Sequence, residues 1–403
     1  MAMPANYYSS EDQLAAGASS DEDVLASDAD HTTRRDQNAY PRPAKQGLKP
    51  VAEPASDNDS TTGRDQTRDK HATAQDGLLT PGTHSKFPCG VRQYADQLDI
   101  DSRQNFLVET FAVLTMAIYL GWIHVLTALL VWAFWNKWIA VLLAGIWATV
   151  FLPAEPLLWE PFLSNPVLVA WRRYFRFSAI CETKVDLRKK YVFAEYPHGV
   201  FPMSQLVAIS LTDMAWPGHK IYSLAASSVF NVPFWRHCMT WLGARPATER
   251  NFKRLIKMGS VGLVPGGIAE MYLVDDHAEV IKIKDRKGFV RVAVEHGTEI
   301  IPVYHFGNSQ LFKWGPKSWE GLSRKWRVAL GFMFGRYNLP LPNRVPLMMA
   351  VGAPVPVRKT HPTDPGFQAA VDEAHVALMA AMQRLYNIYK GEYGWQDRPL
   401  IMK

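Results

Sequence analysis

Cysteine is scarce in this chain, with only Cys89, Cys181 and Cys238 among 403 residues. The three are widely spaced and form no Cys-x-x-Cys pair, which argues against a disulfide framework or a thiolate zinc site and favours a reducing compartment. No apolar run lies near Met1, so we expect no cleavable secretory signal. Arginine-rich runs, RNA-binding signatures and zinc-finger spacings are missing, and nucleic acid is therefore the least favoured partner. No metal site is expected.

Large apolar residues are sparse in the first 105 residues, which are rich in Asp, Ser, Ala, Thr and Pro. A segment of this composition cannot bury enough apolar surface to fold, so we expect residues 1–105 to form a disordered acidic tail. They hold 17 acidic and 11 basic residues, and the remainder of the chain carries a net charge of +12. Such a basic body suits an anionic membrane surface or an anionic cofactor.

The longest apolar stretch follows this tail. Phe111–Trp135 contains no charged residue if His124 is neutral, and 15 apolar residues follow from Trp138 to Leu152. About 20 residues cross a bilayer core, so we predict a transmembrane helical hairpin over residues 106–153. Its turn lies at the Asn136/Lys137 break or near Gly121, and two buried helices of a soluble protein are the alternative. Both termini should face the cytosol, because basic residues flank the run on its two outer sides: Arg103, Arg172, Arg173 and Arg176.

Beyond the apolar stretch, short apolar runs alternate with helical patterns. This alternation predicts an α/β domain over residues 154–403. The expected strands are Tyr191–Tyr196, Lys220–Ala225, Gly262–Val264, Glu299–Phe306 and Leu347–Val351, and the expected helices are 203–215, 232–242, 248–258 and 286–296. Near the end, apolar residues at helical spacing predict a helix with a core-facing stripe: Val371, Ala374, Leu378, Met382, Leu385 and Tyr389.

The stretch "EYPHGVFPMS" places His198 between Pro197 and Gly199, directly after a predicted strand. The carboxyl end of a strand is where α/β proteins usually place their sites, so His198 is a candidate catalytic residue, with a purely structural turn as the alternative. In "LVPGGIAEMYL", Gly266 and Gly267 again follow a strand and precede Glu270. Paired glycines let backbone amides approach a ligand, and the alternative is a tight turn before a helix.

A third stretch, "DRKGFVRVAVEHGTEIIPVYHFGNSQLF", carries Arg286, Lys287 and Arg291 at the start of an amphipathic helix. These cations suit a phosphate group, although a solvated helix face is an equal alternative.

The three stretches, in this order and after an apolar hairpin, resemble the type-2 diacylglycerol acyltransferase family, which includes monoacylglycerol and wax-ester acyltransferases. The resemblance runs from about Tyr191 to Gly394 and rests on "PHG", "VPGGIAE", "RKGFVRVAVEHG", "IIPVYHFGNSQLFKW" and "VGAPVPV". The chain departs from many animal members at Tyr196, where those members carry a second histidine. Met203 stands where the wider glycerolipid acyltransferases have an aspartate, so an Asp/His pair of that spacing is absent.

The resemblance implies an acyltransferase-like domain with a mixed central sheet, and an enzyme of the endoplasmic reticulum membrane with lipid droplets as a second location. It implies transfer of a fatty acyl group from acyl-CoA, which is a substrate and not a cofactor, to the hydroxyl of diacylglycerol. Monoacylglycerol or a fatty alcohol is the alternative acceptor. A lipid-droplet structural or lipid-carrier protein is the alternative outside enzymes. Acyl-CoA, diacylglycerol and membrane lipid are the expected partners, and a homo-oligomer is left open.

For this reaction we assign His198 as the general base, because a neutral imidazole can take the proton of an attacking alcohol. The amides of Gly266, Gly267 and Ile268 are the candidate oxyanion donors. Glu270 is expected to orient the imidazole, with Glu195 as the weaker alternative. Ser204, Cys181 and Cys238 have no triad-like context, which favours direct transfer over an acyl-enzyme. Four cations are candidates for the CoA phosphates: Arg245, Arg286, Lys287 and Arg291.

Overall fold

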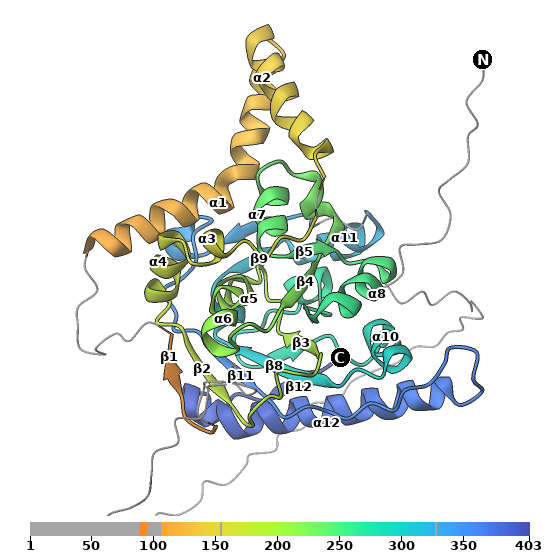
Figure 1. The fold of residues 1–403 in the computed structure, drawn as a ribbon. Coiled ribbons are helices and arrows are strands. Elements are labelled where there is room, and N and C mark those ends of the chain that lie inside the picture. The colour runs from red at the N-terminus through yellow and green to blue at the C-terminus, as the bar shows by residue number, and fades with distance from the viewer. Residues whose placement is uncertain (1–88, 96–105, 154, 327–328) are drawn as a thin grey trace, which may run out of the picture. The chain divides into compact units, whose positions relative to one another are not determined.

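The computed structural model describes residues 89–95, 106–153, 155–326 and 329–403 (Figure 1). Most of the predicted disordered tail, residues 1–88 and 96–105, lies outside this part. Residues 89–95 lie inside it, and there the prediction of disorder is wrong: strand β1 (Gln93–Tyr94) pairs antiparallel with β2 (Ser178–Cys181). The composition of the tail hides this strand because its two residues gain their hydrogen bonds only from a distant partner.

An eight-stranded mixed sheet is the centre of the fold, in the order β1-β2-β11-β8-β3-β6-β4-β5. Strands β8, β3, β6, β4 and β5 are parallel, whereas β11 is antiparallel to β8. The α/β class and the mixed sheet are therefore confirmed, and the five predicted strands all occur. Beyond β1 and β2, the sheet contains β3 (Val192–Tyr196), β4 (Ile221–Ala225), β5 (Ala244–Pro246), β6 (Ser260–Leu263), β8 (Ile300–Phe306) and β11 (Met348–Val351).

Two further strand pairs lie outside this sheet. Strand β7 (Glu279–Ile281) pairs in parallel with β12 (Leu400–Met402) near the carboxyl end of the chain. Strand β9 (Lys313–Gly315) pairs antiparallel with β10 (Phe332–Phe334).

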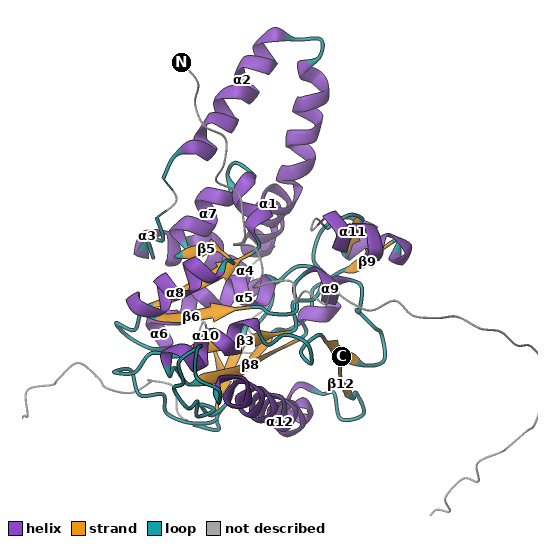
Figure 2. Cartoon of the chain, turned by 90° about the vertical axis from the view of Figure 1, so that its right-hand side faces the viewer, coloured by secondary structure: helices purple, strands orange, loops and turns teal. Residues whose placement is uncertain are grey.

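Helices cover both faces of the sheet because its strands are apolar on both faces (Figure 2). In β3, Phe193 belongs to one core cluster, and Val192 and Ala194 belong to the other. The first cluster includes α4 (Pro166–Tyr174), α5 (Met203–Ala208) and α7 (Trp235–Trp241), and the second includes α8 (Glu249–Met258), α10 (Gly288–His296) and α12 (Phe367–Tyr393).

The predicted helix 203–215 is interrupted. After α5 the chain forms a 3-10 turn (Ile209–Leu211) and then the short α6 (Thr212–Ala215). The other three predicted helices correspond to α7, α8 and α10. Four helices of the described residues were not predicted: α3 (Glu160–Leu163), α4, α9 (Ile268–Met271) and α11 (Glu320–Trp326).

Helix α12 runs along the sheet beside α10, and its apolar stripe is buried as predicted (Figure 1). All six residues of the stripe are at most 8% exposed, and four of them are fully buried. The left-handed Gly394 ends the helix, which is the usual role of glycine at this position.

The apolar stretch folds into α1 (Phe106–Ala133) and α2 (Lys137–Ala148), which contact each other. The break between them lies at Asn136, whose side chain accepts hydrogen bonds from the amides of Trp138 (3.0 Å) and Ile139 (3.4 Å). Gly121 lies within α1, so the break in the apolar stretch is at Asn136/Lys137 and not near Gly121. Among the described residues, α1 is the one helix long and apolar enough to cross a membrane.

The first half of α1 packs on the α/β domain. Met116 and Leu120 join the core cluster of α4, α5 and α7. The indole of Trp122 donates to the carbonyl of Pro233 (2.8 Å), and the indole of Trp235 donates to the carbonyl of Tyr119 (2.8 Å). The predicted division at residue 153 therefore separates segments that share one core.

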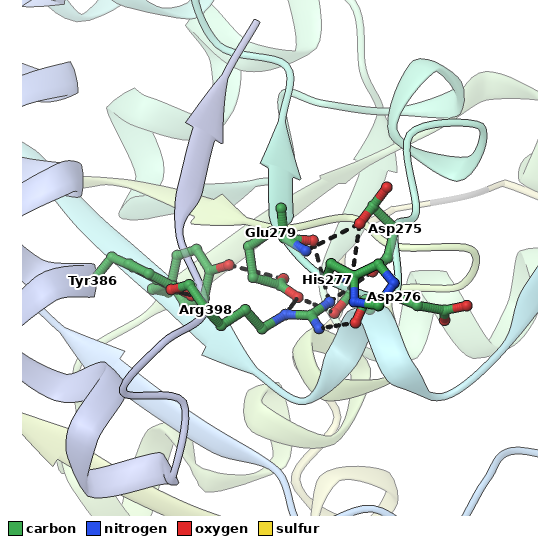
Figure 3. Close-up of polar contacts among 9 residues, drawn as sticks. Asp275, Asp276, His277, Glu279, Tyr386 and Arg398 are labelled. Atoms are coloured by element: carbon green, nitrogen blue, oxygen red, sulfur yellow. Dashed lines mark hydrogen bonds and ion pairs between the residues drawn. The ribbon is translucent and has the colours of Figure 1, made fainter. Parts of the chain in front are cut away.

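A buried ion pair joins Arg398, near the carboxyl end of the chain, to Glu279 on β7 (Figure 3). Arg398 Nε donates to Glu279 Oε1 (2.8 Å), and its guanidinium also donates to the carbonyls of Asp275, Asp276 and Ala278. Glu279 is 1% exposed and accepts further bonds from the Tyr304 and Ser309 hydroxyls. Burial raises the pKa of the Glu279 carboxyl although these donors favour its charged form.

We expect Arg398→Met to lower the free energy of unfolding by about 3–5 kcal/mol, because it leaves the Glu279 carboxylate buried without its cation. Arg188→Met is the matched control, since Arg188 pairs with Asp186 at the surface and should change stability by less than about 1 kcal/mol. Denaturant unfolding of the purified protein in detergent measures both values, and equal losses for the two variants would contradict the expectation.

Candidate active site

Three adjacent parallel strands deliver the candidate residues to one edge of the sheet. Strand β3 lies between β8 and β6 (Figure 2), and the loop after each strand carries residues of the candidate site. His198 follows β3, Gly266 follows β6 and Asn308 follows β8. Because parallel strands end at the same edge, residues that are about 40 to 110 positions apart in the sequence meet there.

The imidazole of His198 has one nitrogen in a hydrogen bond to the main chain. His198 Nδ1 lies 2.9 Å from the carbonyl oxygen of Gly199, so Nδ1 carries the proton and donates it. In the neutral ring Nε2 is then an acceptor. Gly199 has a φ of 62°, a backbone conformation that favours glycine. Burial lowers the pKa of His198 below its ordinary value, which keeps the ring neutral at physiological pH.

Glu270 meets the main chain of His198 and not its ring. Glu270 Oε2 accepts from the His198 amide (2.5 Å), and Oε1 accepts from the Lys282 amide (2.7 Å). The expected contact between this carboxylate and the imidazole is therefore absent, and the tautomer of His198 is set by the Gly199 carbonyl. Burial raises the pKa of Glu270 to about 7, against the two amide hydrogen bonds that lower it.

Gly266 makes room for this carboxyl group. A Cβ at position 266 would lie 2.0 Å from Glu270 Cδ, so no other residue fits there without moving Glu270. Gly267 has a φ of 56° and open space around it. Among the described residues, the amides of Gly266 and Gly267 donate to no protein acceptor. Two unused amides thus lie beside the carboxyl group that holds the His198 loop, where an oxyanion could accept from them.

Glu195 points to a different histidine. His305 Nε2 donates to Glu195 Oε2 (3.0 Å), and His305 Nδ1 accepts from the Ser204 hydroxyl (2.8 Å). Ser204 therefore has a triad-like context, contrary to the prediction. Ser204 and His305 are both fully buried, and the ring nitrogens are used in the reverse of the catalytic serine arrangement. We therefore assign no nucleophilic role to Ser204.

Two side chains that the sequence analysis missed hold the carbonyls of the His198 loop. Gln205 Nε2 donates to the Pro197 carbonyl (2.8 Å). Asn308 Nδ2 donates to the carbonyls of His198 (2.9 Å) and Pro197 (3.3 Å). Asn308 is the second residue after an apolar strand, as His198 is, and this shared position could have indicated it from the sequence.

Three of the four candidate cations lie at the start of α10, and Arg245 lies on β5. Lys287 pairs with Asp372 (2.7 Å), and Arg291 donates to Gln368 (2.9 Å), so both contact α12. Arg245 pairs with Glu155 (3.4 Å). Arg286 interacts electrostatically with Glu270, whose carboxyl group bonds to the His198 amide. No group of three or more metal-binding side chains occurs in the described part of the chain.

The chain matches the family model described as diacylglycerol acyltransferase over residues 131–403. It is 28% identical over 262 residues to diacylglycerol O-acyltransferase 2 of Dictyostelium discoideum, covering 60% of this chain and 76% of that protein. It is 27% identical over 291 residues to diacylglycerol O-acyltransferase 2A of Umbelopsis ramanniana, covering 65% and 80%. It is 26% identical over 266 residues to mouse 2-acylglycerol O-acyltransferase 1, covering 60% and 78%.

Among solved structures, the 1-acyl-sn-glycerophosphate acyltransferase of Thermotoga maritima matches with a TM-score of 0.34 and 10% identity, covering 68% of this chain and 95% of that one. A similarity this low carries no argument about the fold.

A mixed α/β sheet with a histidine, a glycine pair and a carboxyl group at one edge, in a chain with these relatives, defines an acyltransferase. The family match covers more than half of the chain, and the protein belongs to the diacylglycerol acyltransferase family. The resemblance seen in the sequence motifs is thereby confirmed.

The raised pKa of Glu270 predicts how stability depends on pH. The folded-state pKa lies above the unfolded value, so this residue's contribution is fully present below about pH 4.5 and is lost as the pH rises through about 7. The free energy of unfolding should fall by about 3 kcal/mol over this range. Glu270→Gln should remove that slope, and the control Glu299→Gln should retain it. Denaturant unfolding at several pH values tests this, and identical slopes for all three proteins would contradict it.

Proposed function

We propose that this protein transfers a fatty acyl group from acyl-CoA to the free hydroxyl of diacylglycerol, giving triacylglycerol and CoA. The observation that carries the proposal is the placement of His198 at the end of the central strand, with Nδ1 held by Gly199 and its main chain held by Glu270. The family supports acyl transfer, and two of the relatives are named as diacylglycerol O-acyltransferases.

In the proposed reaction His198 Nε2 takes the proton of the acceptor hydroxyl as its oxygen attacks the thioester carbonyl. A ring with a lowered pKa is neutral at pH 7 and therefore ready to accept this proton. The tetrahedral intermediate then expels the CoA thiolate, which takes the proton from the imidazolium. His198 returns to its neutral form, and no acyl-enzyme is needed.

The negative charge on the intermediate requires hydrogen-bond donors that are already in place. The amides of Gly266, Gly267 and Ile268 are our candidates, since those of Gly266 and Gly267 make no bond within the described residues. We retain Arg245, Arg286, Lys287 and Arg291 as candidates for the CoA phosphates. Arg286 is the first of them to test because it acts on Glu270 electrostatically.

We further propose that α1 and α2 enter a bilayer and bring the enzyme to its lipid acceptor. The support is the length of α1 and the apolar side chains that both helices expose, such as Ile118 and Leu130 on α1 and Val141 on α2. The endoplasmic reticulum, with both termini in the cytosol, is the proposed location, and lipid droplets are a second one.

The acceptor is tested by incubating purified protein in micelles with radiolabelled acyl-CoA and, in turn, diacylglycerol, monoacylglycerol and a fatty alcohol. The proposal expects the highest kcat/KM with diacylglycerol. A relative named as a 2-acylglycerol O-acyltransferase makes monoacylglycerol the second candidate. Absence of transfer to all three acceptors would favour a lipid-carrier or lipid-droplet structural protein.

We expect His198→Asn to lower acyl transfer by about 100-fold or more with normal expression, because asparagine has no nitrogen that accepts a proton near neutral pH. His361→Asn is the matched control, since His361 is exposed and contacts Thr363 at the surface. In the wild type, the apparent pKa of the acidic limb of the kcat/KM profile should lie below the ordinary histidine value of about 6.5. A His198→Asn variant that keeps more than about a third of the wild-type rate returns His198 to a structural role.

A further inference from the structure

One buried carboxamide fixes both ends of the loop that carries His198. Asn308 is 1% exposed, and its Nδ2 donates to the carbonyls of His198 and Pro197. Its Oδ1 accepts from the amide of Ser204, at the start of α5 (3.0 Å). The loop begins at Pro197 and leads into α5, so this one side chain joins its start to its end.

A chain of hydrogen bonds supports the far end of this loop. The Ser204 hydroxyl bonds to His305, and His305 bonds to Glu195 on β3. From Glu195 these hydrogen bonds lead through His305, Ser204 and Asn308 to His198. His198 lies three residues after Glu195 in the sequence, so the bonds form a closed circuit. Both ring nitrogens of His305 and all polar atoms of the Asn308 side chain are used within this circuit.

We propose that Asn308 is a positioning residue for acyl transfer, which holds the main chain of His198 so that its imidazole stays in the productive place. The inference rests on the proposed role of His198 as the base. The physical route is short: the carboxamide fixes the His198 carbonyl, which fixes the following peptide. That peptide leads to the Gly199 carbonyl, to which Nδ1 donates.

Asn308→Asp is the sharpest test, because it preserves size and the acceptor for Ser204 but removes both donors to the loop carbonyls. We expect kcat to fall about 10- to 100-fold, with KM for acyl-CoA changed less than about threefold. The apparent pKa of the acidic limb of the kcat/KM profile should rise toward the ordinary histidine value of about 6.5, because a less firmly held ring gains contact with water. Asn251→Asp is the control, since Asn251 Nδ2 donates in the same way to the Pro246 carbonyl (2.9 Å) on β5, at the far end of the strand order.

The outcomes separate this inference from the proposed function. A His198→Asn variant that remains active overturns the base, and the role of Asn308 with it. An inactive His198→Asn variant together with a fully active Asn308→Asp variant overturns this inference alone. A loss of kcat with an unchanged pH profile shows a structural role only and also overturns it. If Asn308→Asp does not fold, Ser204→Ala loosens the same circuit by one bond and should give a smaller pH shift in the same direction.

Apolar side chains are exposed on α11, on the 3-10 turn before it (Lys317–Trp319) and on β10. Trp319, Leu322 and Trp326 recur at helical spacing, yet this apolar stripe faces outward, with exposed fractions of 41%, 47% and 63%. The inner side of α11 is polar: Ser323 is fully buried and bonds to Leu330 and Tyr272. Phe332 and Phe334 extend the outward surface, since Trp319 contacts Phe332.

The chemistry of this aromatic surface matches a lipid bilayer with anionic headgroups. Tryptophan and phenylalanine beside exposed lysines, here Lys317 and Lys325, are typical of side chains that lie at a membrane interface. The surface is also continuous with the catalytic part of the chain, because α11 contacts α9, the helix that carries Glu270 (Figure 2). We infer that this aromatic surface binds the anionic face of the membrane from which the acceptor lipid comes.

The test uses the full-length protein with Cys89→Ser, since the other two cysteines are buried. Three variants each add one cysteine at an exposed position: Phe332→Cys on β10, Val376→Cys on α12 and Leu130→Cys on α1. An environment-sensitive fluorophore is attached to the added cysteine of each variant. In phosphatidylserine-containing vesicles, brominated lipid should quench the label at 332 at least about twofold more than the label at 376. Lys317→Glu with Lys325→Glu, or vesicles of phosphatidylcholine alone, should reduce this quenching.

Equal quenching at 332 and 376, or quenching at 332 that ignores lipid charge, overturns the inference. Quenching at 130 with none at 332 overturns it while leaving the proposed membrane entry of α1 intact. A label at 332 that responds to protein concentration in detergent, without vesicles, assigns the surface to a second copy of the chain and likewise overturns it.

Discussion

The hydrogen bond between the His198 amide and Glu270 constrains the positions of two loops and of the strands that carry them. It places a carboxyl group from the loop after β6 against the main chain of the loop after β3. The group is buried, so each of its oxygens needs a donor, and the amides of His198 and Lys282 supply them. Any side chain at Gly266 would occupy the same volume. The glycine pair, the carboxyl group and the histidine loop are therefore one packed unit.

The sheet brings these loops together because β6, β3 and β8 are parallel and adjacent. Strands β6, β3 and β8 end at the same edge, and their loops supply Glu270, His198 and Asn308. Side chains on the two faces of β3 pack into two different core clusters, so a shift of one residue would exchange them and disrupt both packed clusters. The register of the core thus fixes the position of the loop, and the loop fixes the imidazole.

Two buried glutamates beside this edge have different surroundings. Glu279 accepts from Arg398, Tyr304 and Ser309, so a cation compensates its charge. Glu270 accepts from two neutral amides, and burial raises its pKa to about 7. Ser309 follows Asn308 directly, so the Arg398–Glu279 pair also supports the segment that holds the His198 loop. The last residues of the chain are in this way tied to the site.

Local sequence patterns were enough to predict the repetitive features of the fold. Apolar periodicity located the five strands and the α12 stripe, because burial on a sheet or a helix face repeats every two or about 3.6 residues. Pro197, Gly199 and the glycine pair marked the loops at the strand ends, and the order of motifs identified the family. The break at Asn136 was among the predicted turns, since a polar residue that can cap a helix interrupts an otherwise apolar run.

The contacts between side chains of the site could not be predicted from local patterns. Glu270 bonds to the amide of His198 and not to its ring, Glu195 bonds to His305, and Asn308 holds the loop from about 110 residues away. Strand β1 likewise forms only by pairing with β2, which is distant in the sequence. These contacts depend on strand order and register, which set the distance between residues remote in sequence. A local sequence pattern does not specify such distances. The sequence therefore predicted several residues of the site but not their hydrogen-bond partners.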